Sequence, residues 1–174
     1  LDDGHLMRYH DPRRFGAVLW HLGPPESHPL LSRLGPEPLS DGFDAAGLLH
    51  ALAGRRQALK VALMDNAVVV GVGNIYAAES LFGAGISPLR AANRIGRERY
   101  RKLVPAIREV LETSIAAGGS SVRDYVHSDG GAGCFQLSCA VYDRAGQPCP
   151  TCGQPVRAIR QSGRSTFYCP RCQH

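Results

Sequence analysis

The sequence predicts a mainly helical protein with small β parts, and three features lead to that prediction. Apolar residues recur at helical spacing through the middle of the chain, most clearly from Tyr100 to Ile115. Two short apolar segments near the start, around Leu6 and Val18, are typical of strands. Four paired cysteines near the C-terminus indicate a small metal-bound domain built on a β-hairpin.

The first 25 residues are predicted to form a β-hairpin. Residues 5–9 and 16–20 are the expected strands, and Asp11-Pro12 marks the turn between them. A two-stranded hairpin is only marginally stable alone in water. We therefore expect these strands to be remnants of a larger sheet that the 174 residues do not contain. Residues 26–41, rich in glycine and proline, are the expected linker.

Residues 42–133 are predicted to be a helical domain. Asp44 is expected to cap a helix that ends near Gly54, and residues 55–63 to continue as a second helix. A glycine-rich turn, 71–74, leads into a third helix over 75–82.

The helical prediction continues to residue 125. Ser87 is expected to cap a further helix that has Pro88 at its first position. The periodic run from Tyr100 to Ile115 should be kinked at Pro105 and stopped by the glycines at 118–119. A short helix from Ser120 or Ser121 to Tyr125 should follow.

The last domain, residues 134–174, is predicted to bind one structural zinc ion. Its pattern is C-x2-C-x16-C-x2-C, formed by Cys149, Cys152, Cys169 and Cys172. Two thiolate pairs at this spacing can close a tetrahedral sphere around zinc. Disulfides or unpaired core cysteines are the alternative interpretation. Cys134 and Cys139 lie outside the quartet and are expected to be buried thiols.

The charge of the chain favours a polyanionic partner. The formal net charge is +5 and the sequence pI is about 9.1. From Cys149 to His174 there is no acidic residue, while the arginines are Arg157, Arg160, Arg164 and Arg171. Arg164 follows a turn-like Ser162-Gly163 and should project outward to phosphate. A solvated surface that only balances the thiolates is the alternative. No segment approaches the roughly 20 apolar residues of a membrane span.

The glycine-rich turn before the third predicted helix is typical of an anion site. Gly71 and Gly73 allow the backbone to approach a ligand, and the following helix points N–H groups toward it. Asn74 adds an amide donor. A dinucleotide fingerprint is disfavoured because Tyr76 stands where its third glycine should be. A tight interhelical turn without a ligand is the alternative.

Arg13-Arg14-Phe15 lies at the tip of the predicted N-terminal hairpin. An exposed ring can wedge between base pairs while an arginine contacts a base edge or a phosphate. The alternative is that Phe15 packs inward and both arginines face solvent.

Four motifs in their order and spacing resemble the bacterial formamidopyrimidine-DNA glycosylases, over essentially all 174 residues. They are Asp11-Pro12-Arg13-Arg14-Phe15-Gly16, then Leu34-Gly35-Pro36-Glu37-Pro38-Leu39, then Met64-Asp65-Asn66 with Val70-Gly71-Val72-Gly73-Asn74-Ile75-Tyr76, and the cysteine quartet with Thr166-Phe167-Tyr168. The resemblance implies a helix–two-turn–helix DNA-binding domain and a zinc finger, preceded by strands of a β-sandwich catalytic domain. It also implies base excision repair of oxidised purines such as 8-oxoguanine, by a DNA glycosylase with AP lyase activity.

The same resemblance assigns roles to individual residues. Arg13, with Arg14 beside it, faces the base left unpaired when the lesion is flipped out, and Phe15 is the wedge. Asn74 and Arg164 grip phosphates that flank the lesion, and Tyr76 belongs to the same DNA-binding set. Lys60 binds near the damaged base. Residues 128–133 form the loop that closes over the flipped purine.

The resemblance also implies a difference at the reacting centre. The family nucleophile is the amine of an N-terminal proline followed by glutamate, whereas this sequence begins Leu1-Asp2-Asp3. We therefore expect these residues alone to bind double-stranded DNA with an oxidised base or an abasic site, without excising bases. The intact protein is expected to be a monomer in the bacterial cytoplasm at the nucleoid. A naturally shortened, non-catalytic DNA binder and a zinc-ribbon protein-interaction module are the alternatives.

Overall fold

The computed structural model describes residues 2–11, 14–119 and 138–174, and the chain divides into two units, Leu1–Arg33 and Leu34–His174. Within the described ranges, no helix is both long enough and apolar enough to cross a membrane.

The first unit contains one short helix of the 3-10 type, η1 (Pro25–Ser27). In its described residues, the strands predicted over 5–9 and 16–20 are not formed. Leu6 and Trp20 are 94% and 88% exposed, so no apolar layer packs on these segments. A strand also needs a neighbour for its backbone N–H and C=O groups. The Arg14 N–H donates to the Asp11 carbonyl at 3.1 Å, and Pro12 of the expected turn lies outside the described residues.

The second unit begins with two helices, one that starts where the sequence predicts and one that is shorter than predicted. Helix α1 (Ala45–Leu52) starts where predicted, because the Asp44 side chain accepts from the Gly47 N–H at 2.7 Å. Helix α2 (Leu59–Leu63) is shorter than the predicted 55–63. Residues 55–58 instead pair with a later segment through an antiparallel bridge between Ala58 and Ala91. Tertiary backbone pairing therefore replaces the first turn of the predicted helix.

Helix α3 (Asn74–Gly83) follows the glycine turn, as the sequence predicts. The helix expected to start at Ser87 is not formed. Ser87 instead closes a turn in which its carbonyl accepts from the Arg90 N–H at 3.2 Å. The chain then enters the bridge to Ala58 and a short 3-10 helix, η2 (Ala92–Arg94).

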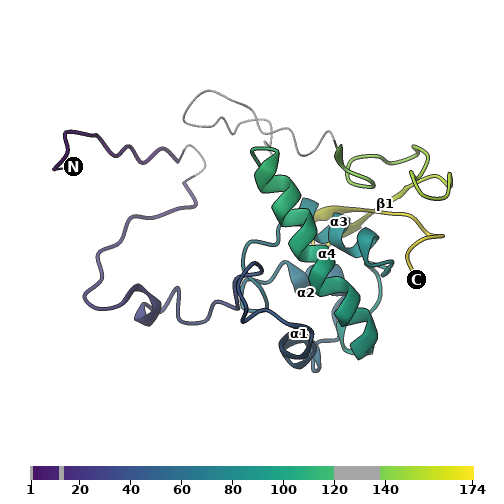
Figure 1. Cartoon of the computed structure of the whole chain (residues 1–174), viewed down its shortest axis with the longest axis horizontal. Coiled ribbons are helices and arrows are strands. Elements are labelled where there is room, and N and C mark those ends of the chain that lie inside the picture. Colours follow the sequence, from purple (N-terminus) through teal and green to yellow (C-terminus); the bar gives the residue numbers. More distant parts are fainter. Residues whose placement is uncertain (1, 12–13, 120–137) are drawn as a thin grey trace. The chain divides into compact units, whose positions relative to one another are not determined.

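Helix α4 (Arg97–Ala116) is the longest helix and continues through Pro105 (Figure 1). It ends as predicted, because Gly118 and Gly119 adopt positive φ values of 74° and 86°. The Gly119 N–H donates back to the Ser114 carbonyl at 2.7 Å, which satisfies a carbonyl of the last turn. The short helix predicted over 120–125 lies outside the described residues.

The main core lies between the helices. Helix α4 packs against both α1 and α3 (Figure 1). The Tyr100 hydroxyl, at the centre of this core, donates to the Ala92 carbonyl at 2.9 Å. The largest apolar side chains with at most 2% exposure here are Phe43, Leu48, Leu52, Leu59, Leu63, Leu81, Ile86, Leu103 and Ile107.

Residues 34–43 are packed onto this helical body. A Cβ at Gly35 would lie 2.6 Å from the carbonyl carbon of Val68, so only glycine fits there. The Gly35 N–H donates to the Asn66 carbonyl at 2.7 Å. The Arg108 guanidinium on α4 donates to three carbonyls of the segment, those of Pro38, Ser40 and Phe43. The second half of the predicted linker is therefore fixed to the helices.

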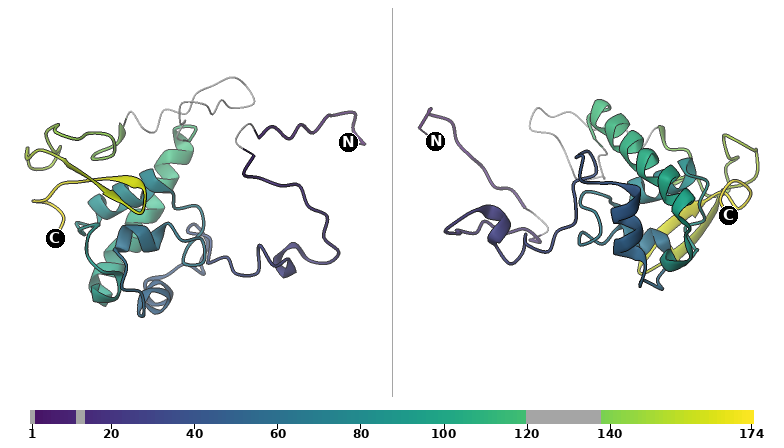
Figure 2. Two further views of the ribbon diagram at one scale, coloured as in Figure 1. Left: turned by 180° about the vertical axis from the view of Figure 1, so that it is seen from behind. Right: turned by 60° about the horizontal axis from the view of Figure 1, so that its bottom comes forward.

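The C-terminal hairpin consists of β1 (Arg157–Gln161) and β2 (Arg164–Tyr168), which pair antiparallel. Ser162 and Gly163 form its turn with φ values of 46° and 77°, the positive values that tight hairpins prefer. Strand β2 lies against α3 (Figure 2). A second small core joins them, made of Ala78 and Phe82 from α3 with Val141, Cys149, Val156, Phe167 and Cys169.

Candidate nucleic-acid interface and metal centre

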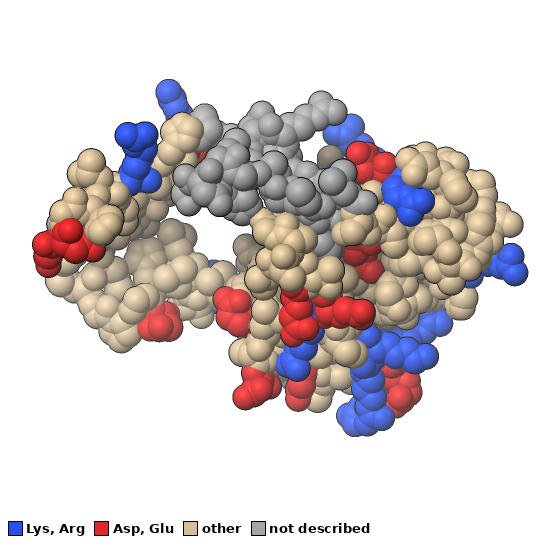
Figure 3. Space-filling model, turned by 45° about the horizontal axis from the view of Figure 1, so that its top comes forward, with Lys and Arg blue, Asp and Glu red and all other residues tan. Residues whose placement is uncertain are grey.

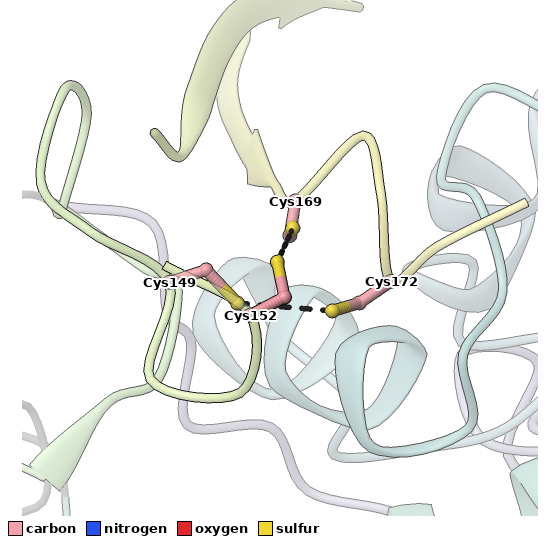
Figure 4. Close-up of side chains that lie close together, drawn as sticks. All are labelled: Cys149, Cys152, Cys169 and Cys172. Carbon is pink, nitrogen blue, oxygen red and sulfur yellow. Dashed lines mark hydrogen bonds between the residues drawn. The ribbon is translucent and has the colours of Figure 1, made fainter. Parts of the chain in front are cut away.

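The four cysteines converge on one point from two loops (Figure 4). The Sγ atoms of Cys149 and Cys172 are 3.8 Å apart, those of Cys152 and Cys169 are 3.4 Å apart, and all four lie within 4.8 Å of one another. A tetrahedral zinc ion with Zn–S bonds of about 2.3 Å requires sulfurs about 3.8 Å apart. The donor set therefore fits one structural zinc ion and confirms the sequence prediction.

Each cysteine pair lies in a tight turn that the sequence encodes locally. The Gly153 N–H donates to the Cys149 carbonyl at 2.9 Å, and Gly153 has a φ of 74°. Gln173 organises the second turn, where its side-chain oxygen accepts from the Cys169 N–H at 2.8 Å. The Gln173 amide also donates to the Ile86 carbonyl at 3.0 Å. The metal centre is thereby seated on the helical body.

A hollow of about 260 Å³ lies where α3 meets the tip of the hairpin. Among the described residues, none that lines it is acidic; they are Met64, Asn66, Gly71, Val72, Gly73, Asn74 and Arg164. Gly73 is the N-cap of α3 and has no side chain to cap it. The first N–H groups of an α-helix have no partner within the helix, and they carry partial positive charge. The hollow therefore offers amide donors, a helix N-terminus and a guanidinium to an anion.

Lys60 of α2 lies behind this hollow and is 0% exposed. Its ammonium donates to Asn74 Oδ1 at 2.5 Å, to the Ser165 carbonyl at 3.0 Å and to Thr166 Oγ1 at 2.8 Å. Burial, together with the nearby charge of Arg164, lowers the Lys60 pKa to about 8. One buried cation thus links α2, α3 and β2.

Glu79 fixes the chain that enters the finger. Its carboxylate accepts three backbone N–H bonds, from Ala140 at 2.7 Å, Val141 at 3.0 Å and Tyr142 at 2.7 Å. The Tyr142 hydroxyl in turn accepts from Asn74 Nδ2 at 3.4 Å. Sequence reasoning missed Glu79 and Tyr142. The available signal was that Glu79 is the one charged residue of α3.

The structure brings Lys60, Asn74 and Arg164 together from three elements, α2, α3 and β2, the last of which lies about 90 positions or more along the chain from the other two. Tyr76 is half-buried, and its hydroxyl lies 2.8 Å from Ser114 Oγ, which joins α3 to α4. Arg14 has a φ of 53°, and Phe15 is 84% exposed, so its ring does not pack inward.

Arg13, Cys134 and the predicted closing loop over 128–133 lie outside the described residues. Cys139 is buried, as predicted, and burial raises the pKa of its thiol to about 12.

The distribution of charged side chains can be followed on one face of the molecule. On the face drawn in Figure 3, lysine and arginine occur at several separate places, with acidic residues near some of them. A polyanion bound on this face would meet separate cationic positions, with acidic residues near some of them.

Comparisons with known proteins find similarity in both the helical region and the finger. Residues 34–126 match the formamidopyrimidine-DNA glycosylase H2TH domain, and residues 146–174 match the zinc finger found in FPG and IleRS. The formamidopyrimidine-DNA glycosylase of Laribacter hongkongensis is 69% identical over 173 residues, covering 99% of this chain and 64% of the relative. That of Dechloromonas aromatica is 65% identical, covering 98% and 63%. The chain thus spans less than two thirds of these relatives.

Solved structures give the same result. The crystal structure of the MutM (Fpg) protein from Thermus thermophilus is 46% identical, with a TM-score of 0.86, over 94% of this chain and 63% of that one. A complex between Lactococcus lactis Fpg and DNA containing an abasic site is 35% identical, with a TM-score of 0.75, over 83% and 53%.

Proposed function

The chain belongs to the formamidopyrimidine-DNA glycosylase family, and from this membership we propose that it is the damaged-DNA-binding part of a bifunctional DNA glycosylase and AP lyase. The whole protein would remove oxidised purines, including 8-oxoguanine and formamidopyrimidines, in the bacterial cytoplasm at the nucleoid. Its partner would be double-stranded DNA that carries such a base or an abasic site. The protein would act as a monomer.

The hollow between α3 and the hairpin tip carries this proposal. Asn74 and Arg164 line it from two domains, none of the described lining residues is acidic, and the N-terminus of α3 opens onto it. This combination suits the phosphates of a DNA backbone. We assign Asn74, Arg164 and Tyr76 to the backbone contact. Lys60 belongs to the same site from within.

A second set of contacts is proposed for the first unit. Arg13 and Arg14 would face the unpaired base, and Phe15 would wedge beside it. The 84% exposure of Phe15 supports this role, because a wedge must be accessible at the surface to enter a base step. Flipping a nucleotide out of the stack costs a few kcal/mol, which the wedge and the phosphate contacts offset.

Base excision would require a nucleophile outside these groups. The family resemblance points to the amine of an N-terminal proline. The prolines of residues 1–174 all have their nitrogen in a peptide bond, so none of them offers that amine. We therefore propose that residues 1–174 alone bind DNA and do not excise bases. A zinc-ribbon module for protein partners remains the contrasting function, and it predicts no salt-dependent affinity for DNA.

The decisive experiment measures DNA affinity against salt for Arg164→Ala. We expect fluorescence anisotropy with a duplex containing a tetrahydrofuran abasic analogue to give about tenfold weaker binding. The slope of log K against log salt should fall by about one, because one phosphate contact is lost.

Arg171→Ala is the matched control. It removes the same charge from the same finger, but at the cysteine end, and β2 alone separates the two ends by roughly 13 Å at about 3.3 Å per step. We expect this variant to keep the slope of the unmodified chain. Equal slopes for Arg164→Ala and the unmodified chain would remove the hollow from the DNA interface.

A further inference from the structure

We propose that Lys60 is a positioning residue that does not touch DNA, and that its ammonium holds the Asn74 amide and the start of β2 in the arrangement that receives a phosphate. This inference rests on the proposed function of the hollow. It replaces a direct contact near the damaged base, the role implied for Lys60 by the family resemblance.

The geometry leaves the Lys60 ammonium no donor for a ligand. An ammonium has three N–H donors, and all three have acceptors inside the protein: Asn74 Oδ1, the Ser165 carbonyl and Thr166 Oγ1. The side chain is 0% exposed and does not line the hollow. A DNA phosphate could reach Lys60 only by breaking one of these bonds.

The bond from Lys60 determines which way the Asn74 amide points. An amide has an oxygen that accepts and a nitrogen that donates. Because Lys60 occupies Oδ1, the amide nitrogen lies on the other side, where Nδ2 donates to the Tyr142 hydroxyl, and Asn74 is one of the residues that line the hollow. The side of Asn74 available to a ligand is therefore the side that recognises an anion. Without the ammonium, the amide could flip and present its oxygen to the phosphate.

The same cation fixes Arg164. Ser165 and Thr166 follow Arg164 directly on β2, and both accept from Lys60. The ammonium of Lys60 thus holds both sides of the hollow, the start of β2 on the finger side and Asn74 at the start of α3 on the other. Lys60 converts two groups on separate domains into one rigid site, which reduces the ordering cost of binding.

The charges around Lys60 make this role measurable. The groups that face it are Arg164 and Thr166 from β2 and Asn74 from α3, with Tyr142 beyond Asn74. In the described ranges, no carboxylate forms an ion pair with Lys60. A phosphate in the hollow would therefore favour the charged form of Lys60, so its pKa should rise on DNA binding.

A double-mutant cycle with Lys60→Met and Asn74→Ala tests the proposal. Lys60→Met alone should weaken binding to the abasic-analogue duplex about tenfold, since it frees the Asn74 amide. In the Asn74→Ala background the same change should cost no more than about threefold, because the residue that Lys60 orients is gone. Lys102→Met, which removes the other lysine of the chain from an exposed site on α4, is the charge control. It should have equal, small effects in both backgrounds.

Nuclear magnetic resonance of the unmodified chain provides a test that needs no substitution. The side-chain NH₂ signals of Asn74 should titrate with an apparent pKa of about 8, the Lys60 value, and with a higher pKa when DNA is bound. The signals should lose this titration in Lys60→Met.

The outcomes separate the two proposals. Additive effects in the cycle, or Asn74 signals that stay constant from pH 7 to pH 9, would overturn the positioning role of Lys60 while leaving the Arg164 result intact. An unchanged affinity of Arg164→Ala would instead remove the phosphate site itself.

Discussion

Single residues in this protein have structural roles that the composition does not reveal, as Lys60 shows. Lys60 is one of two lysines, and a sequence reader expects its charge at the surface. The structure buries it completely among three neutral acceptors. The local pattern of residues 59–63 does not predict this burial, because the hydrogen-bond acceptors of Lys60 at 165–166 are more than 100 positions away.

The burial of Lys60 predicts a specific pH dependence of stability. Its pKa is lowered from 10.5 to about 8, mainly by burial, so between these values the unfolded chain holds more protons than the folded one. The free energy of unfolding should therefore rise with pH across this window. The gain should be at most about 3 kcal/mol, since a neutral amine keeps only two of the three hydrogen bonds.

Urea unfolding at intervals from pH 7.5 to pH 10.5 measures this dependence. Cysteine and tyrosine titrate in the same range, so the relevant quantity is the difference between the unmodified chain and Lys60→Met. That difference should grow with pH, whereas Lys102→Met should run parallel to the unmodified chain. A constant difference would show that Lys60 keeps an ordinary pKa.

At the scale of elements, α3 connects the two cores. Leu81 faces the helical core, whereas Ala78 and Phe82 face the finger core. Glu79, between them, accepts the three N–H groups that lead the chain into the finger. The position of the finger thus depends on one carboxylate of this helix.

Glu79→Gln should lower the free energy of unfolding by about 2 kcal/mol. The change removes the charge from the hydrogen bonds and turns one acceptor into a donor that faces an N–H group. Urea unfolding measures the loss. Glu109→Gln, at an exposed site on α4, should change stability by less than about 0.5 kcal/mol. Similar small effects of both substitutions would contradict the role of Glu79.

The elements differ in how well the sequence predicted them, and the reason is physical. Helix α1, the end of α4 and the hairpin turn depend on local groups such as Asp44, Gly118 and Gly163, and all three predictions are confirmed. The start of α2 and the helix expected at Ser87 were wrong. Both lie where the Ala58–Ala91 bridge takes the backbone hydrogen bonds, and no local pattern encodes a pairing across 33 positions.

The site follows the same division. Asn74 and Arg164 were singled out from local turn chemistry, and their contact with DNA stays a prediction. The convergence of the four cysteines was predictable, because ligand spacing is read over a few residues. The roles of Lys60, Glu79 and Tyr142 were not, because each depends on contacts with residues more than 60 positions away.

On the scale of the second unit, the two cores predict a stepwise response to metal removal. The helical core contains no finger residue, whereas the finger core includes Cys149 and Cys169. A strong chelator should therefore unfold residues 146–174 and leave most helical circular dichroism intact, because zinc binding supplies the folding energy of such domains. DNA affinity should be lost at the same chelator concentration.

Limited proteolysis with mass spectrometry locates the unfolded part. New cleavages should fall within the finger and not within α1, α3 or α4, and added zinc should reverse them. A finger that resists protease in excess chelator would show that the hairpin is stable without metal.

The shared helix has a consequence for anyone who wishes to exchange the finger. Because α3 contributes Ala78, Phe82 and the Glu79 carboxylate to the finger side, the finger is not an independent cassette that begins at residue 146. A donor finger grafted from another protein would meet a foreign docking helix, and its tip arginine would miss the hollow. A working chimera must carry the outer face of α3 with it, together with the lysine behind it.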